Sequence, residues 1–136
     1  MIVADTSVWI DYFKGQISPA TDLLDERLDT SLVVIGDLIL LEILQGFKVD
    51  KDYKLAKAML LLLEQRAFLG SELALIAAEN YRQLRKKGIT IRKTNDVIIA
   101  SYCIEHNLPL LFSDRDFLPF VEHLGLRCAL GKGVGT

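Results

Sequence analysis

The sequence predicts an α/β protein with three layers, in which helices cover both faces of a central, mainly parallel sheet. Short apolar runs typical of buried strands alternate along the chain with segments of helical periodicity, as in strand-helix-strand crossover units. The 136 residues fit a single domain over 1–136. A hydrophobic content of 51% is enough for a core without disulfides, and a charged content of 25% is ordinary for a globular chain.

The first elements are marked by capping and breaking residues. Residues 1–4 are apolar and predict a strand. Any of Asp5, Thr6 and Ser7, which follow directly, could cap a helix that Gly15 ends. A second helix is predicted over 19–28, because Pro19 is well tolerated in a first turn. The chain therefore begins with a strand, a turn and two helices.

The middle of the chain continues this alternation. Residues 32–35 are apolar and largely β-branched, which predicts a buried strand, and the helix that follows runs from Asp37 to near Gly46. Apolar residues recur at helical spacing over 50–65, and 67–69 predicts a short strand.

The last third contains two longer helices and two further strands. A helix over 71–87 ends before a glycine, and another is predicted over 94–104. Residues 108–112 and 126–130 predict strands. Glycines then form a loose tail: Gly131, Gly133 and Gly135.

Charge and cysteine content exclude several classes of protein. The net charge of −2 excludes a uniformly basic nucleic-acid binder, although a local basic patch remains compatible with it. Cys103 and Cys128 form neither a disulfide framework nor a zinc motif, so we expect a reduced, cytoplasmic setting. No apolar run approaches the ~18 residues that span a membrane, and Asp5 interrupts the start of any signal peptide. A mean hydropathy of +0.28 favours an oligomer.

Acidic residues occupy the positions where such sheets bind their ligands. In parallel α/β sheets, ligands bind beyond the carboxyl ends of the strands, where the strand order reverses. One acid follows the first strand, two follow strand 108–112, one lies in the first turn of a helix, and one lies inside an apolar helix. These acids are Asp5, Asp114, Asp116, Asp96 and Glu42.

A cluster of these carboxylates predicts a divalent cation. Neighbouring carboxylates repel one another, which raises their pKa values unless a cation neutralises them. Oxygen-only sites suit Mg²⁺ or Mn²⁺, which can activate water for hydrolysis of a phosphodiester. Taken singly, each acid has an ordinary structural explanation as a helix cap, a turn residue or an exposed side chain. Their joint placement favours a metal site.

Four segments in order resemble the PIN domain, and their spacing fits the small VapC-like toxins of toxin–antitoxin pairs. They are Ile2-Val3-Ala4-Asp5-Thr6-Ser7-Val8, Glu42, Asp96-Val97-Ile98-Ile99-Ala100 and Leu110-Leu111-Phe112-Ser113-Asp114-Arg115-Asp116-Phe117. The resemblance implies that Asp5, Glu42, Asp96 and Asp114 bind the metal. It adds Asp116 as a contact to a second ion, and Thr6 or Ser7 as a residue that places a water or a phosphate oxygen. Phe112 and Ser113 replace a frequent Thr, which leaves the division of roles between Asp114 and Asp116 open.

The resemblance also implies an activity and partners. The activity is that of an endoribonuclease that uses Mg²⁺ or Mn²⁺ to cleave structured RNA such as tRNA or rRNA, leaving 5′-phosphate and 3′-hydroxyl ends. The partners are a second copy in a homodimer and a cognate antitoxin. The antitoxin's C-terminal segment would wrap around the toxin and place a basic side chain in the acidic site.

One basic segment could bind RNA phosphates. Residues 82–93 hold cations and no acid: Arg82, Arg85, Lys86, Lys87, Arg92 and Lys93. Such a patch gives salt-sensitive affinity that is blind to sequence. The alternative is that cations near a helix C-terminus favour its dipole and solubilise a loop.

Two other functions remain as alternatives. A phosphoaspartyl phosphatase would use an early Asp as nucleophile with a second Asp two residues later, but Ser7 stands two residues after Asp5. A non-catalytic, PIN-like module that binds RNA or protein is the second alternative. Retention of all the acids speaks against it, because unused clustered carboxylates destabilise a fold.

Overall fold

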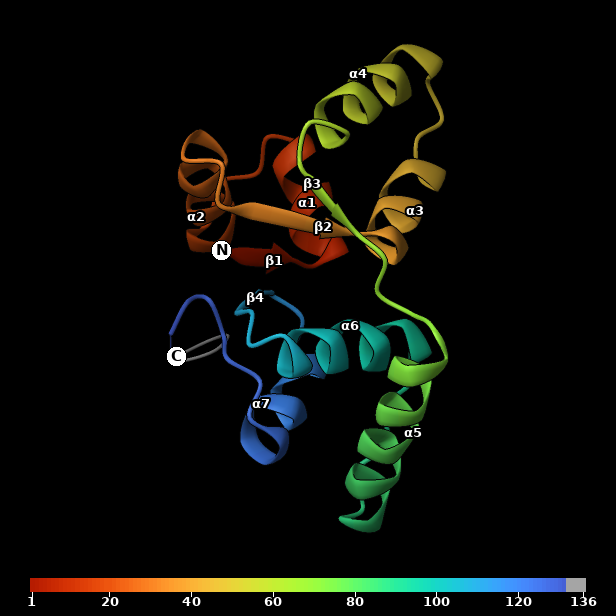
Figure 1. The fold of residues 1–136 in the computed structure, drawn as a ribbon. Helices are drawn as coiled ribbons and strands as arrows, with labels where there is room; N and C mark the ends of the chain where they lie inside the picture. Colours follow the sequence, from red (N-terminus) through yellow and green to blue (C-terminus); the bar gives the residue numbers. More distant parts are fainter. Residues whose placement is uncertain (132–136) are drawn as a thin grey trace.

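The computed structural model describes residues 1–131 (Figure 1). Gly133 and Gly135 of the predicted glycine tail lie outside these described residues. Within 1–131, no helix is both long enough and apolar enough to cross a membrane.

The described strands form one parallel sheet in the order β3-β2-β1-β4. Its strands are β1 (Ile2–Ala4), β2 (Val33–Gly36), β3 (Glu64–Arg66) and β4 (Leu110–Leu111). The first strand pairs with β2 on one side and with β4 on the other. The strand order therefore reverses between β1 and β4, and the carboxyl ends of these two strands lie side by side.

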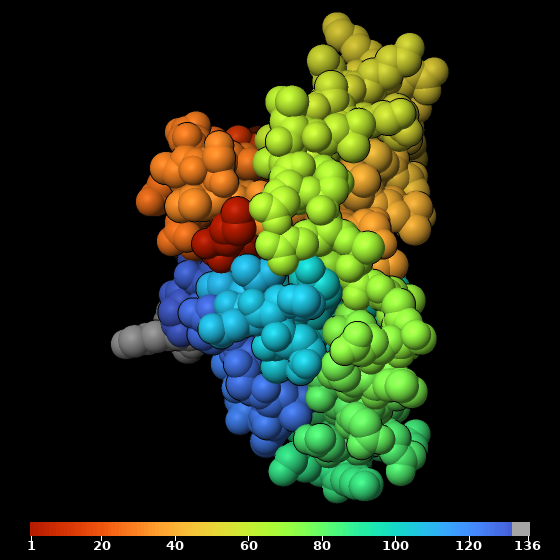
Figure 2. Space-filling model, in the orientation of Figure 1, coloured from red at the N-terminus to blue at the C-terminus, as the bar shows by residue number. Residues whose placement is uncertain are grey.

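Helices flank this sheet, as the predicted α/β/α fold requires. They are α1 (Thr6–Phe13), α2 (Pro19–Asp29), α3 (Asp37–Gln45), α4 (Asp50–Leu60), α5 (Ser71–Lys86), α6 (Thr94–Glu105), the 3-10 turn η1 (Arg115–Phe117) and α7 (Leu118–Leu124). The first helix packs against α2 and α3, whereas α5 packs against α6 and α7. Figures 1 and 2 show α4 and α5 at opposite ends of the molecule.

The hydrophobic core joins the sheet to α1 and α6. Every residue of β1, β2 and β4 is buried, as is the continuous stretch of α6 from Asp96 to Cys103. Trp9 and Phe112 are fully buried in the same core. Because α6 is buried at its first turn, a carboxylate carried there is held inside the protein.

The prediction was wrong around β3. The strand is the polar Glu64–Arg66 and not 67–69, and α4 ends at Leu60 instead of continuing to 65. The apolar Phe68, which favoured the later strand, is buried beside β2: a Cβ atom on Gly36 would lie 2.5 Å from its ring. Burial of Phe68 explains the apolar character of 67–69 without a strand.

The prediction also failed near the end of the described chain. The strand expected over 126–130 is reduced to one bridge between Leu110 and Cys128, and strand 108–112 shortens to β4. Neither η1 nor α7 was predicted. Both elements contribute apolar side chains to the core, since Phe117 of η1 and Phe120 of α7 are fully buried.

Candidate metal centre

Two strand ends position the first acids of the site. Asp5 follows β1 directly and caps α1, where its side chain accepts a hydrogen bond from the Ser7 backbone N–H. Asp114 lies three residues beyond β4 and caps η1, with its Oδ1 accepting from the Asp116 backbone N–H at 2.9 Å. Each cap fixes a carboxylate at the carboxyl edge of the sheet.

Three carboxylates meet in this region of the sheet edge. One oxygen from each of Asp96, Asp114 and Asp116 lies within 4.8 Å of the other two. Asp96 is only 7% exposed, and its buried Oδ2 has no hydrogen-bond partner. A buried polar atom without a partner is costly, so this oxygen marks a place for a further ligand.

The other two predicted acids are held by hydroxyl groups, and we call Asp5 and Glu42 the hydroxyl-held acids. Ser7 Oγ donates to Asp5 Oδ2 at 2.9 Å, and Thr6 Oγ1 donates to Glu42 Oε1 at 2.8 Å. Asp5 is 5% exposed, and Glu42 is partly exposed. The start of α1 thus holds one acid in its own cap and a second acid on α3.

The acids after β4 are instead paired with cations, and we call Asp114 and Asp116 the cation-held acids. Arg92 Nη2 lies 3.0 Å from Asp116 Oδ2, and Lys93 Nζ lies 3.9 Å from Asp114 Oδ2. Both cations come from the loop between α5 and α6 and are well exposed. Pairs of this kind are weak in water and are screened by salt.

Burial and mutual repulsion shift the proton equilibria of two acids. Burial raises the pKa of Asp5, and the Ser7 hydrogen bonds oppose this rise. The pKa of Asp96 rises to about 7, mainly through burial and next through the charge of Asp5. Lys93 lowers the Asp96 pKa, while Asp114 and Glu42 raise it. Four of the predicted acids therefore interact electrostatically in one pocket.

The basic segment divides into two parts. Arg92 and Lys93 pair with the acids, whereas Arg82, Arg85 and Lys86 are exposed on α5. Arg82 Nε lies 4.0 Å from a Glu79 oxygen, and the Arg85 guanidinium lies 5.6 Å from the centre of the Tyr81 ring. None of the described contacts joins these α5 cations to the acids.

The sequence did not predict which group pairs with which acid. The hydroxyls of Thr6 and Ser7 were expected to face a water or phosphate, but both donate to carboxylates. For Arg92 and Lys93, the sequence left open whether they bind RNA phosphates or only solubilise a loop, and it did not point to the acids as their partners. A signal for their pairing was present, because Lys93 stands immediately before the helix that carries Asp96, but the path of a loop cannot be inferred from spacing.

The donor set fits a hard divalent cation. All the gathered groups are carboxylates, and Asp96 Oδ2 is buried with nothing to bind. Oxygen ligands of this kind suit Mg²⁺ or Mn²⁺ and not zinc, which prefers Cys and His. The fold and the gathered carboxylates together define a parallel α/β protein with an acidic cluster, consistent with a metal site, where its strand order reverses.

Comparison with known proteins identifies the family. The chain matches the PIN domain over residues 2–120 and belongs to the PIN domain family. It is 31% identical over 121 residues to VapC ribonuclease Mb1587 of Mycobacterium bovis, an alignment that covers 86% of this chain and 89% of that protein. It is 28% identical over 126 residues to ribonuclease VapC1 of Methanocaldococcus jannaschii, covering 93% and 85% respectively. Within the PIN family, the chain therefore belongs with the VapC ribonucleases.

Solved structures of low sequence identity share the fold. VapBC2 from Rickettsia felis, bound to a DNA fragment from the promoter of its genes, has a TM-score of 0.75 at 21% identity, covering 94% of this chain and 97% of that one. FitAcB from Neisseria gonorrhoeae has a TM-score of 0.72 at 18% identity, covering 96% and 98%. Both agree with the predicted PIN-like architecture.

Proposed function

We propose that this protein is an endoribonuclease that depends on Mg²⁺ or Mn²⁺ and serves as the toxin of a toxin–antitoxin pair. The observation that carries the proposal is the meeting of Asp96, Asp114 and Asp116, with a buried Asp96 oxygen that lacks a partner. The VapC relatives are named as ribonucleases, which supports RNA as the substrate. Structured RNA such as tRNA or rRNA is the substrate class that we propose.

Each residue of the pocket has a role in this proposal. All five acids are proposed metal ligands: Asp96, Asp114 and Asp116 would hold the cation with their gathered oxygens, and Asp5 and Glu42 would add carboxylates from the side of α1. A bound divalent cation lowers the pKa of water and stabilises charge on a phosphate. Ser7 and Thr6 keep the carboxylates of Asp5 and Glu42 in place through hydrogen bonds at 2.9 and 2.8 Å. Cleavage would leave 5′-phosphate and 3′-hydroxyl ends.

Nuclease activity is tested with labelled tRNA in the presence of Mn²⁺, with EDTA as the metal-free arm. We expect cleavage by the wild type with Mn²⁺, and its loss with EDTA or in Asp96→Asn. Glu26→Gln is the matched control, because Glu26 is an exposed acid on α2, outside the acidic cluster. This variant should cleave RNA like the wild type. Cleavage that persists in both EDTA and Asp96→Asn would exclude the metal mechanism. Absence of any RNA cleavage would favour a binding module, and release of phosphate from an acyl-phosphate substrate would favour a phosphatase.

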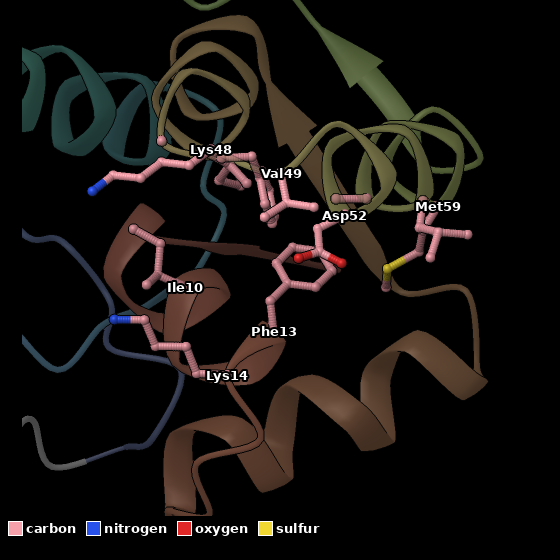
Figure 3. A pocket seen from close by; sticks show the side chains of 12 residues that line it. Ile10, Phe13, Lys14, Lys48, Val49, Asp52 and Met59 are labelled. Carbon is pink, nitrogen blue, oxygen red and sulfur yellow. The ribbon is translucent and has the colours of Figure 1, made fainter.

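An apolar groove is the proposed docking site of the antitoxin. It lies between α1, the end of α3 and α4, has a volume of about 760 Å³, and includes Ile10, Phe13, Leu55 and Met59 (Figure 3). Leu55 is 64% exposed. The structural relatives include a toxin–antitoxin complex from Klebsiella pneumoniae, with a TM-score of 0.69 at 16% identity, covering 93% of this chain and 95% of that one.

The groove is tested by co-expression with a candidate antitoxin, namely the product of a short reading frame that overlaps or immediately precedes the gene. Leu55→Asp should abolish co-purification, whereas Leu75→Asp should retain it. Leu75 is the matched control because it is 72% exposed on α5, at the other end of the molecule. The opposite pattern would indicate that the antitoxin binds α5 instead.

Two further parts of the proposal have their own tests. Light scattering of the purified protein measures whether it forms the proposed homodimer, and fractionation of cells tests the proposed cytoplasmic location.

A further inference from the structure

We propose that Arg92 and Lys93 are internal counter-ions that leave Asp116 and Asp114 when a divalent cation binds and then bind the phosphates of the substrate. This inference rests on the proposed metal-dependent function. It makes the loop before α6 a competitor of the metal ion in the free protein and a phosphate-binding element in the loaded one.

The oxygen atoms of Asp114 are already occupied in the free protein. Its Oδ1 accepts a hydrogen bond from the Asp116 backbone N–H at 2.9 Å, and its Oδ2 faces Lys93 Nζ at 3.9 Å. The backbone bond is part of the cap of η1, whereas the lysine contact involves a flexible side chain. A cation that binds Asp114 therefore displaces Lys93 before it displaces the cap.

Asp116 has a similar arrangement. Arg92 Nη2 donates to Asp116 Oδ2 at 3.0 Å, and the Arg92 side chain is 76% exposed. A dication bound to this carboxylate repels the guanidinium beside it, because both carry positive charge. An exposed arginine loses little when it moves into water.

The backbone of the loop holds both cations at the edge of the pocket after they separate from the acids. Lys93 is the residue before α6, and its carbonyl accepts the Asp96 backbone N–H at 3.1 Å. Released side chains therefore remain next to the cluster, where a substrate phosphate must approach the cation. Arg82 and Arg85 lie on α5 and have no described contact with the acids, so they do not share this role.

The first test measures Mn²⁺ affinity by calorimetry without RNA. Removal of the competing charges in Arg92→Gln/Lys93→Gln should tighten Mn²⁺ binding by roughly threefold or more. Arg82→Gln/Arg85→Gln is the control, with the same change of charge on the same basic segment, and should match the wild type. Equal Mn²⁺ affinity in the wild type and in Arg92→Gln/Lys93→Gln would overturn the inference.

A double-mutant cycle separates direct pairing from a long-range field. In an Asp116→Asn background, Arg92→Gln should change Mn²⁺ affinity much less than it does in the wild type, because the carboxylate that Arg92 pairs with is gone and only its longer-range interactions with Asp114 and Asp96 remain. An undiminished effect in that background would show general electrostatics and overturn the pairing mechanism.

The second test measures binding of tRNA with Ca²⁺ as the cation, under conditions where no cleavage is detected. Arg92→Gln/Lys93→Gln should weaken tRNA binding and reduce the slope of log affinity against log salt by about 1 to 2. An unchanged slope would overturn the phosphate-binding step. Failure of the wild type to bind Mn²⁺ would overturn the proposed function itself, whereas wild-type Mn²⁺ binding that is unchanged in Arg92→Gln/Lys93→Gln overturns only the counter-ion inference.

Discussion

The two sides of the acidic pocket neutralise their carboxylates by different chemistry. The hydroxyl-held acids, Asp5 and Glu42, accept short hydrogen bonds from neutral groups on the first turn of α1. The cation-held acids, Asp114 and Asp116, face exposed charges from a loop. Neutral donors leave the negative charge in place, whereas cations cancel it. One side is therefore ready for a metal ion, and the other must first release its cations.

Asp96 lies in the first turn of α6 and belongs to neither side. It is buried and charged at neutral pH only at a cost, since one of its oxygens has no partner. Burial raises its pKa to about 7, which means that the charged form of Asp96 is less stable in the folded protein than in water. Without a cation, the clustered acids lower the free energy of unfolding, and Asp96 makes the largest contribution to this loss.

The largest effect is expected from Asp96→Asn, which removes a buried carboxylate that Lys93 stabilises only in part. Mn²⁺ affinity should fall by at least about 100-fold, because loss of groups that merely support a metal ligand already costs roughly 10- to 100-fold. The metal-free variant should nevertheless melt several degrees above the wild type at pH 8, because a buried charge is gone. Calorimetry and thermal melts measure the two effects.

The pH dependence of the metal-free wild type sharpens this test. The folded-state pKa of Asp96 lies above the unfolded value of 3.8, so the folded protein binds the extra proton and loses stability as pH rises from about 4 to about 7. The advantage of Asp96→Asn should therefore be clearly smaller at pH 5 than at pH 8, and it should disappear only below about pH 4. An advantage of equal size at pH 5 and pH 8 would contradict the assignment of the cost to the Asp96 charge.

A smaller effect is expected from Ser7→Ala on the hydroxyl-held side. Loss of the 2.9 Å bond to Asp5 should lower the free energy of unfolding by about 1–2 kcal/mol at pH 8. Because this bond lowers the pKa of Asp5, the variant should also raise that pKa further. Urea denaturation measures the first effect, with Ser71→Ala as the control, because Ser71 is an exposed serine at the start of α5. A cost at pH 8 no greater than that of Ser71→Ala would show that the hydroxyl does not hold the acid.

The smallest effect on stability is expected on the cation-held side. Arg92→Gln and Lys93→Gln should lower the melting temperature slightly in about 0.05 M NaCl, and the difference should vanish in about 0.5 M NaCl, because exposed ion pairs are screened. The cost of Ser7→Ala should be the same at both salt concentrations. Salt sensitivity of Ser7→Ala, or its absence in the loop variants, would break the distinction between the two sides.

Most of the fold could be predicted because its helices have clear signals at their ends. The helix after Asp5 and the helix that begins at Pro19 appear as expected, since caps and proline act locally. The strand Glu64–Arg66 could not be predicted, because an edge strand that is polar lacks both apolar alternation and a buried run. The apolar, buried Phe68 instead favoured a strand over 67–69, where none forms.

The candidate site divides in the same way. The gathering of Asp96 with Asp114 and Asp116 follows from topology, since parallel strands bring their carboxyl ends to one edge. The pairing of Arg92 with Asp116 spans 24 residues of sequence and depends on the path of a loop. No periodicity encodes that path, so the partners of the acids emerge only from the structure.

The central claim is that these carboxylates form one site for a divalent cation. An anomalous difference map from crystals soaked in Mn²⁺ locates the ion directly. The account predicts a peak bound by Asp96, Asp114 and Asp116, with Arg92 and Lys93 no longer contacting the acids. A map without a peak in this pocket, or a peak held by other residues, would contradict it.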